Sequence, residues 1–126
     1  RQRQMCIRDR LQPLAERLGL NLQYATFDDD LEDLSRSADL IISTVPSAAL
    51  EEYRFQLAHA PVLDVIYHPW PTTLAACAAA NGYFTVGGHV MLAHQAFSQF
   101  EQFTGLTAPR EEMVAALQEE LRLRSL

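Results

Sequence analysis

The chain contains no lysine, and all ten of its basic residues are arginine. Chemistry that requires a lysine amine is therefore excluded for this chain. Its formal net charge of -6 argues against a nucleic-acid-binding surface and against attachment to an anionic membrane. No apolar run approaches the roughly 18 residues that a membrane-spanning helix needs, so neither a membrane span nor a signal peptide is expected.

Cysteine is also scarce, with only Cys6 and Cys77 in 126 residues. Two cysteines in this arrangement form neither a disulfide framework nor a zinc-binding spacing. The four histidines likewise show no metal-ligand spacing with carboxylates. The sequence therefore predicts no metal site, and a reducing cytoplasmic location is the default expectation.

Residues 1–10 differ from the rest of the chain. They carry four of the ten arginines but show no helical or strand period and no turn residues. We interpret them as a non-native leader that resembles translated sequencing-adapter sequence, and exclude them from the fold argument. A basic arm that binds nucleic acid is the alternative. The leader hypothesis predicts that Met5 and Ile7 pack on nothing.

The body alternates between two kinds of hydrophobic pattern. Apolar residues at helical spacing predict helices over 11–18, 31–38, 47–59 and 71–81. Short apolar runs predict strands over 20–26, 39–43, 61–67 and 83–86. Strands that alternate with helices form βαβ units, so the expected fold is α/β with a doubly wound parallel sheet.

A glycine-rich phosphate-binding turn is missing from this pattern. A complete dinucleotide-binding sheet opens with a strand, a G-x-G-x-x-G turn and a helix, and no such motif occurs here. Residues 11–87 are therefore predicted to form a truncated Rossmann-like domain. Residues 88–126 are predicted to add C-terminal helices, over about 89–103 and 109–124. On the first of these helices, Gln95 lies outside the apolar face. Met91, one turn before it, is an apolar residue that also lies among the polar positions.

Three segments in series resemble the shikimate dehydrogenase family. Asp39–Pro46 (DLIISTVP) is similar to its strand ending in an Asn-Ala-Thr-Pro-like turn. Asp64–Leu74 (DVIYHPWPTTL) is similar to its D-x-x-Y-x-P-x-x-T-x-L stretch. Gly87–Ala96 (GGHVMLAHQA), with Phe100 and Thr104–Gly105, is similar to its G-x-x-M-L-x-x-Q-A and F-x-x-x-T-G segments. Each segment alone is weak evidence for this family, but the order and the separations of the three segments together are specific to it.

The resemblance implies an NADP-dependent oxidoreductase that converts 3-dehydroshikimate to shikimate, in the chorismate pathway of aromatic amino-acid biosynthesis. By the same resemblance, Thr44, Val65 and Val90 contact the cofactor, and Tyr67 and Gln95 contact the substrate. The valines and Tyr67 could equally be core residues, and Gln95 a solvated surface glutamine. Asp64 is expected to orient the neighbouring turn rather than to abstract a proton.

The resemblance also implies that the residues for proton transfer belong to another domain. In this family an N-terminal domain supplies the lysine and the aspartate for proton transfer, and the last two helices pack on that domain. No catalytic residue is therefore assigned here, and the chain alone is predicted to be inactive. NAD in place of NADP, a quinate or cyclitol substrate, and a non-catalytic Rossmann-derived interaction module remain alternatives. A monomer and a homodimer both remain open.

Overall fold

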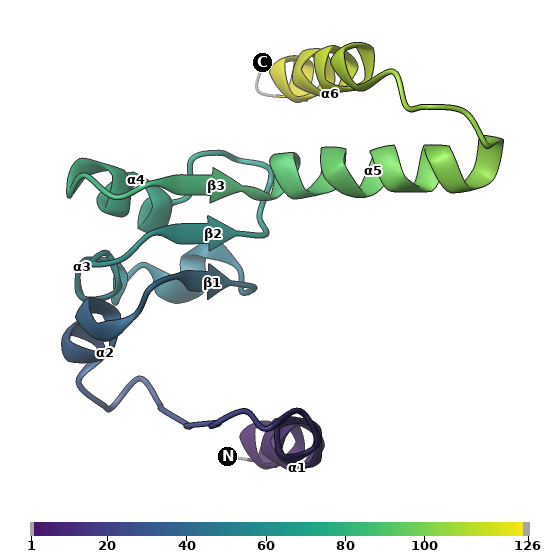
Figure 1. Ribbon diagram of the computed structural model, residues 1–126. Coiled ribbons are helices and arrows are strands. Elements are labelled where there is room, and N and C mark those ends of the chain that lie inside the picture. The colour runs from purple at the N-terminus through teal and green to yellow at the C-terminus, as the bar shows by residue number, and fades with distance from the viewer. Residues whose placement is uncertain (1, 125–126) are drawn as a thin grey trace.

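The computed structural model describes residues 2–124, with side chains described from Asp9 onward. Its elements alternate between helix and strand before ending in two longer helices (Figure 1). In chain order they are α1 (Gln2–Leu18), α2 (Leu31–Ser37), β1 (Ile41–Ser43), the 3-10 turn η1 (Ser47–Leu50), α3 (Arg54–Leu57), β2 (Val62–Asp64), α4 (Thr73–Ala80), β3 (Thr85–Gly87), α5 (Gly88–Thr104) and α6 (Arg110–Arg124).

Within residues 2–124 the three strands form one parallel sheet in the order β1-β2-β3. Ile41 pairs with Val62, which pairs in turn with Thr85, and the register continues in step to the strand ends. The connections between the strands contain η1, α3 and α4, so each is a crossover of the kind that parallel strands require. The predicted α/β class with a parallel sheet is confirmed.

The main core lies on one face of the sheet. Val62 of β2 packs there against Leu50 of η1 and Leu74 of α4, and all three are buried. Two alanines, Ala58 and Ala78, complete this cluster and let the helices approach the sheet closely. Burial of these side chains is the main source of stability for the βαβ units.

The last two helices form a second, smaller core. Ala93 and Phe97 of α5 are buried together with Ala108, and Met113 and Val114 of α6 pack against them. The chain reverses between the helices at Gly105, whose φ of 70° lies in the left-handed region that glycine adopts at little cost. In residues 2–124, no helix is both long and apolar enough to cross a membrane.

Two sequence predictions about regular structure are wrong. The predicted strand over 20–26 is not a strand, because a strand requires a hydrogen-bonded neighbour and the described sheet provides none for this segment. The predicted helix over 47–59 is broken into η1 and α3. At the break, Tyr53 stacks on Phe27, with their ring centroids 4.4 Å apart.

Residues 2–10 belong to α1, although the sequence analysis expects no regular structure there. Arginine, glutamine and methionine are strong helix formers, so local propensity favours a helix even without an apolar period. The prediction that Met5 and Ile7 pack on nothing concerns side chains that lie outside the described residues. Farther along the chain, the helix predicted over 71–81 is confirmed, with Thr72 as its N-cap and Gly82 at a φ of 87° just after it.

Ser35→Ala is expected to lower the free energy of unfolding by about 1–2 kcal/mol. The buried Ser35 hydroxyl donates to the carbonyl oxygen of Leu57 (2.8 Å) and accepts from the amide of His59 (3.0 Å), so it joins α2 to the end of α3. Urea unfolding measures the change. Ser37→Ala is the control, because the exposed Ser37 hydroxyl bonds only locally and its loss should cost less than about 0.5 kcal/mol. Equal effects for the two serines would contradict the bridging role.

Candidate functional site at the carboxyl edge of the sheet

The carboxyl ends of the three strands lie side by side. Ser43, Asp64 and Gly87 are register partners and are also the last residues of β1, β2 and β3. Thr44 and Val65 therefore follow immediately at one edge of the sheet. Open parallel sheets bind ligands at this edge, because the chain leaves each strand there and the following helices begin there.

The start of α5 is pressed against the end of β2. The amide of Gly88 donates to the carbonyl oxygen of Ile66 at 3.0 Å, and the amide of Val65 donates to the carbonyl oxygen of Ser43 at 3.0 Å. A Cβ atom at Gly88 would lie 1.9 Å from the Val65 carbonyl oxygen. Glycine is therefore required at Gly88 for α5 to begin directly on the sheet edge.

The segment that follows β2 is fixed by a buried carboxylate. Asp64 is 1% exposed, and its side chain accepts hydrogen bonds from the amide of Ile66 (3.1 Å) and from the hydroxyl of Thr72 (2.8 Å). Thr72 in turn accepts from the amide of Ala75 (3.3 Å) and caps α4. The prediction that Asp64 orients the neighbouring turn is confirmed.

A hollow of about 280 Å³ opens between this segment and α6. Tyr67 and Trp70 line one side, and His89 of α5 lies edge-on to Trp70 with ring centroids 5.5 Å apart. His68 and three residues of α6 complete the lining: Gln118, Leu121 and Arg122. The ion pair between Arg122 and Glu119, at 2.7 Å, raises the pKa of the guanidinium and lowers the pKa of the carboxyl.

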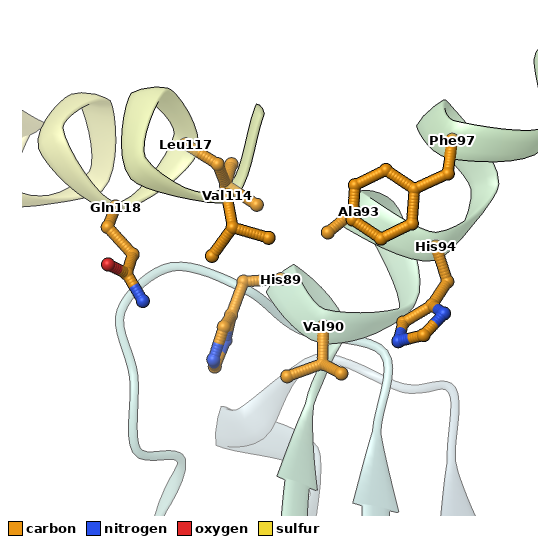
Figure 2. Close-up of a pocket in the computed structure, with 8 residues that line it drawn as sticks. All are labelled: His89, Val90, Ala93, His94, Phe97, Val114, Leu117 and Gln118. Atoms are coloured by element: carbon orange, nitrogen blue, oxygen red, sulfur yellow. The ribbon is translucent and has the colours of Figure 1, made fainter. Parts of the chain in front are cut away.

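A second hollow of about 160 Å³ lies between α5 and α6 (Figure 2). Val90 and Phe97 of α5 face it together with Val114 and Leu117 of α6. His89 borders both hollows. No sequence pattern predicts a site role for Trp70, His89 or Gln118. The paired glycines before His89 are the one signal that two backbone segments approach closely there.

The structure places the five predicted site residues in different surroundings. Thr44 and Val65 lie at the carboxyl edge, Val90 lies in the first turn of α5, and Tyr67 is 45% exposed in the larger hollow. Gln95 is exposed on α5 and lines neither hollow, and its side chain makes no hydrogen bond within the described part of the chain.

The strand predicted over 61–67 is longer than the strand in the structure, so Tyr67 lies beyond it. The structure ends β2 at Asp64, because the Asp64 side chain binds the amide of Ile66 and turns the chain. Among the described residues, no group of three or more histidine, cysteine, aspartate or glutamate side chains could hold a metal ion.

Comparisons with known proteins point to one family. Residues 88–118 match the model of the shikimate 5'-dehydrogenase C-terminal domain. The NADP(+) shikimate dehydrogenase of Haloarcula marismortui is 36% identical over 99 residues, which cover 74% of this chain and 37% of that protein. The crystal structure of Mycobacterium tuberculosis shikimate dehydrogenase aligns with a TM-score of 0.80 and 43% identity over 88% of this chain and 43% of that chain.

A shikimate 5-dehydrogenase structure from Mycobacterium fortuitum gives a similar result, with a TM-score of 0.79 and 44% identity over 86% of this chain and 41% of that chain. This chain thus spans about two fifths of the length of the relatives it matches. The chain belongs to the shikimate dehydrogenase family and corresponds to the C-terminal part of its members.

Proposed function

We propose that this chain forms the nicotinamide side of the active site in an NADP-dependent shikimate dehydrogenase, which reduces 3-dehydroshikimate to shikimate. The observation that carries the proposal is the close approach of Gly88 to Val65 at the carboxyl edge of a parallel sheet. Ligands of open α/β sheets bind at this edge. The matching relatives carry the name shikimate dehydrogenase (NADP(+)), which supports this substrate and this cofactor.

The residues at the edge fit the nicotinamide end of a dinucleotide. The backbone of Gly88 lies directly against Val65 because glycine has no side chain. Thr44, which follows β1, and Val90 of α5 are both exposed. When bound, the cofactor supplies the hydride chemistry, while the protein orients and encloses the reactants. We assign Thr44, Val65 and Val90 to cofactor contact.

Two side chains are assigned to the substrate. Tyr67 presents a phenol that can donate and accept, and Gln95 presents an amide that can do both. A polyhydroxylated acid such as shikimate needs such groups. Tyr67 is held in place by the segment that Asp64 and Thr72 anchor, whereas Gln95 approaches the substrate only from the outer side of α5.

The same proposal covers the rest of the chain. Residues 88–126 pack on the catalytic domain of the intact enzyme, which agrees with the exposure of Leu92, Phe103 and Leu106. Residues 1–10 are a non-native leader. The enzyme acts in the cytoplasm as a monomer or homodimer.

Exposed apolar side chains favour part of an enzyme over a self-sufficient interaction module, since such a module would cover them.

The purified chain is expected to show no shikimate oxidation with NADP or with NAD, because it has no lysine to transfer the proton. A chimera is the matched experiment: residues 11–126 replace the aligned part of the M. tuberculosis enzyme. The chimera should reduce NADP in the presence of shikimate, within about 100-fold of the natural enzyme, the loss that a misplacement of about 1 Å can cause.

Each half of this experiment can fail separately. Turnover by the pure chain above a control without protein would refute the role given to the absent lysine. A folded chimera that oxidises quinate but not shikimate would select the alternative substrate. A chimera that prefers NAD would correct the cofactor.

A further inference from the structure

His89 is a half-buried residue at the point where the two hollows meet. It lies in the first turn of α5 and lines both the smaller hollow (Figure 2) and the larger one beside Tyr67. Gln118 of α6 also lines both hollows. The contacts assigned so far to cofactor and substrate do not include His89, so its imidazole is a polar group without an assigned role.

One edge of the His89 imidazole is packed against Gly87. A Cβ atom at Gly87 would lie 2.6 Å from both Nδ1 and Cε1 of His89. Glycine carries a hydrogen in that direction, so the Cα–H bond of Gly87 points at this edge of the ring. The indole of Trp70 closes the same space, since its Cδ2 atom would lie 2.9 Å from that Cβ position. Nδ1 is therefore enclosed, and it has no hydrogen-bond partner in the part of the chain that the structure describes.

The surroundings of Nδ1 select one tautomer of the imidazole. In the neutral ring, one nitrogen carries a hydrogen and the other accepts. A hydrogen on Nδ1 would point at the hydrogen of Gly87 and would be an enclosed donor without an acceptor, which is costly. A lone pair on Nδ1 instead receives the Cα–H group of Gly87 in a weak hydrogen bond. The hydrogen therefore lies on Nε2.

The larger hollow adjoins the part of the imidazole that Gly87 and Trp70 leave uncovered. This part includes the edge that carries Nε2, opposite the edge that faces Gly87. Tyr67, the proposed substrate contact, lines the same hollow. Its volume of about 280 Å³ is close to the lower end of the roughly 300–1,000 Å³ that is usual for small-molecule sites. An N–H donor thus borders a space that suits one small molecule.

We propose that His89 is a further substrate-binding residue, whose Nε2–H donates a hydrogen bond to an oxygen atom of the substrate that Tyr67 contacts. This inference rests on the proposed function. The ligand class is a small cyclic acid, whose hydroxyl or carboxylate oxygen accepts the bond. Because the lone pair of the ring is enclosed at Nδ1, His89 offers the hollow a donor and no acceptor. It therefore favours substrates with an oxygen at this position.

The tautomer is measured on the full 126-residue chain, labelled with ¹⁵N. Long-range ¹H–¹⁵N correlation spectra distinguish a protonated from an unprotonated ring nitrogen, at an alkaline pH where histidine side chains are neutral. The spectrum of His89→Gln identifies the signals of His89 by their loss. We expect hydrogen on Nε2 and none on Nδ1. Hydrogen on Nδ1 would overturn the proposal.

The contact itself is measured in the ¹⁵N-labelled chimera, with shikimate as the added ligand. The Nε2–H signal of His89 should move downfield as shikimate binds, as expected when the group forms a hydrogen bond. The ring signals of His94, which lines only the smaller hollow, are the internal control and should stay in place. Bound shikimate with an unmoved His89 signal would overturn the proposal.

Two substitutions separate hydrogen bonding from packing. His89→Leu removes the donor, and in the chimera it should raise the KM for shikimate by about 5- to 10-fold, as expected for one neutral hydrogen bond. His89→Gln keeps an N–H donor and should hold this KM within about 3-fold of the unsubstituted chimera. The KM for NADP should change by less than about 2-fold in both, because the donor is assigned to the substrate.

A role in packing alone predicts the opposite order, because leucine suits an apolar contact better than glutamine does. An unchanged KM for shikimate in His89→Leu, or equal losses in the two variants, would therefore overturn the proposal. Circular dichroism checks that each variant folds. If either does not fold, the movement of the His89 signal in the unsubstituted chimera decides.

Failure of the contact and failure of the proposed function give different results. A chimera in which shikimate moves the His89 signal but reduces no NADP would count against the proposed function and leave the contact intact. Turnover of shikimate with an unmoved His89 signal would overturn this inference alone. A folded chimera that binds no shikimate would overturn both.

Discussion

Gly88→Ala is expected to lower the free energy of unfolding of the chain by about 3–4 kcal/mol. The new Cβ would lie 1.9 Å from the carbonyl oxygen and 2.5 Å from the carbonyl carbon of Val65. Both are backbone atoms, so no side-chain rotation relieves the overlap. The junction between β2 and α5 must separate, which breaks the hydrogen bond from the Gly88 amide to the Ile66 carbonyl oxygen.

Helix propensity acts in the opposite direction but is too weak to decide the result. Replacing glycine by alanine within a helix gains up to about 1 kcal/mol, and less at the first helical residue. Urea unfolding followed by the fluorescence of Trp70, the single tryptophan, reports directly on this junction. In the chimera the same substitution should also raise the KM for the cofactor, because the surface next to Val65 is displaced.

Gly87→Ala is the matched control for the neighbouring glycine. Its Cβ would approach the imidazole of His89 at 2.6 Å and the indole of Trp70 at 2.9 Å, which are side-chain atoms that can move. The expected loss is about 1–2 kcal/mol. If Gly88→Ala proved as mild as Gly87→Ala, α5 would not begin as tightly on the sheet edge as the structure shows.

The sequence predicted the parts of the fold that depend on local pattern. The apolar runs around β1 and β2 are short and continuous, as in strands buried within a parallel sheet, and both are confirmed. Helices α4 and α5 end next to Gly82 and Gly105, which adopt positive φ angles. These features could be found because a few neighbouring residues determine them.

Features that depend on partners distant in the sequence could not be found. The pattern of residues 20–26 suits a strand, but only a neighbouring strand makes it one, and no pattern within the segment supplies that neighbour. The hollow beside Tyr67 is completed by Gln118 and Arg122 of α6, whose return over the sheet edge depends on the turn at Gly105. The family resemblance predicts a substrate contact for Tyr67, but it could not place these neighbours.

Gln95→Ala in the chimera is expected to raise the KM for shikimate by about 5- to 150-fold, which corresponds to about 1–3 kcal/mol for a lost hydrogen-bond partner in a buried polar site. Ala93 and Phe97, each two residues from Gln95, are buried in the core shared with α6. Two residues along a helix correspond to about 200°, so Gln95 projects from the opposite side of α5. That side of α5 is the one on which the proposed substrate contact depends.

The KM for NADP should hardly change in this variant, because the amide is assigned to the substrate. Gln99→Ala is the control: Gln99 is exposed one turn farther along α5 and has the same chemistry. It should leave both KM values unchanged. Steady-state kinetics with each ligand varied separately distinguish the outcomes. An unchanged KM and an unchanged kcat for shikimate would make Gln95 a solvated surface glutamine like Gln99. A large loss confined to NADP would place Gln95 on the cofactor side of the cleft, together with Thr44 and Val65.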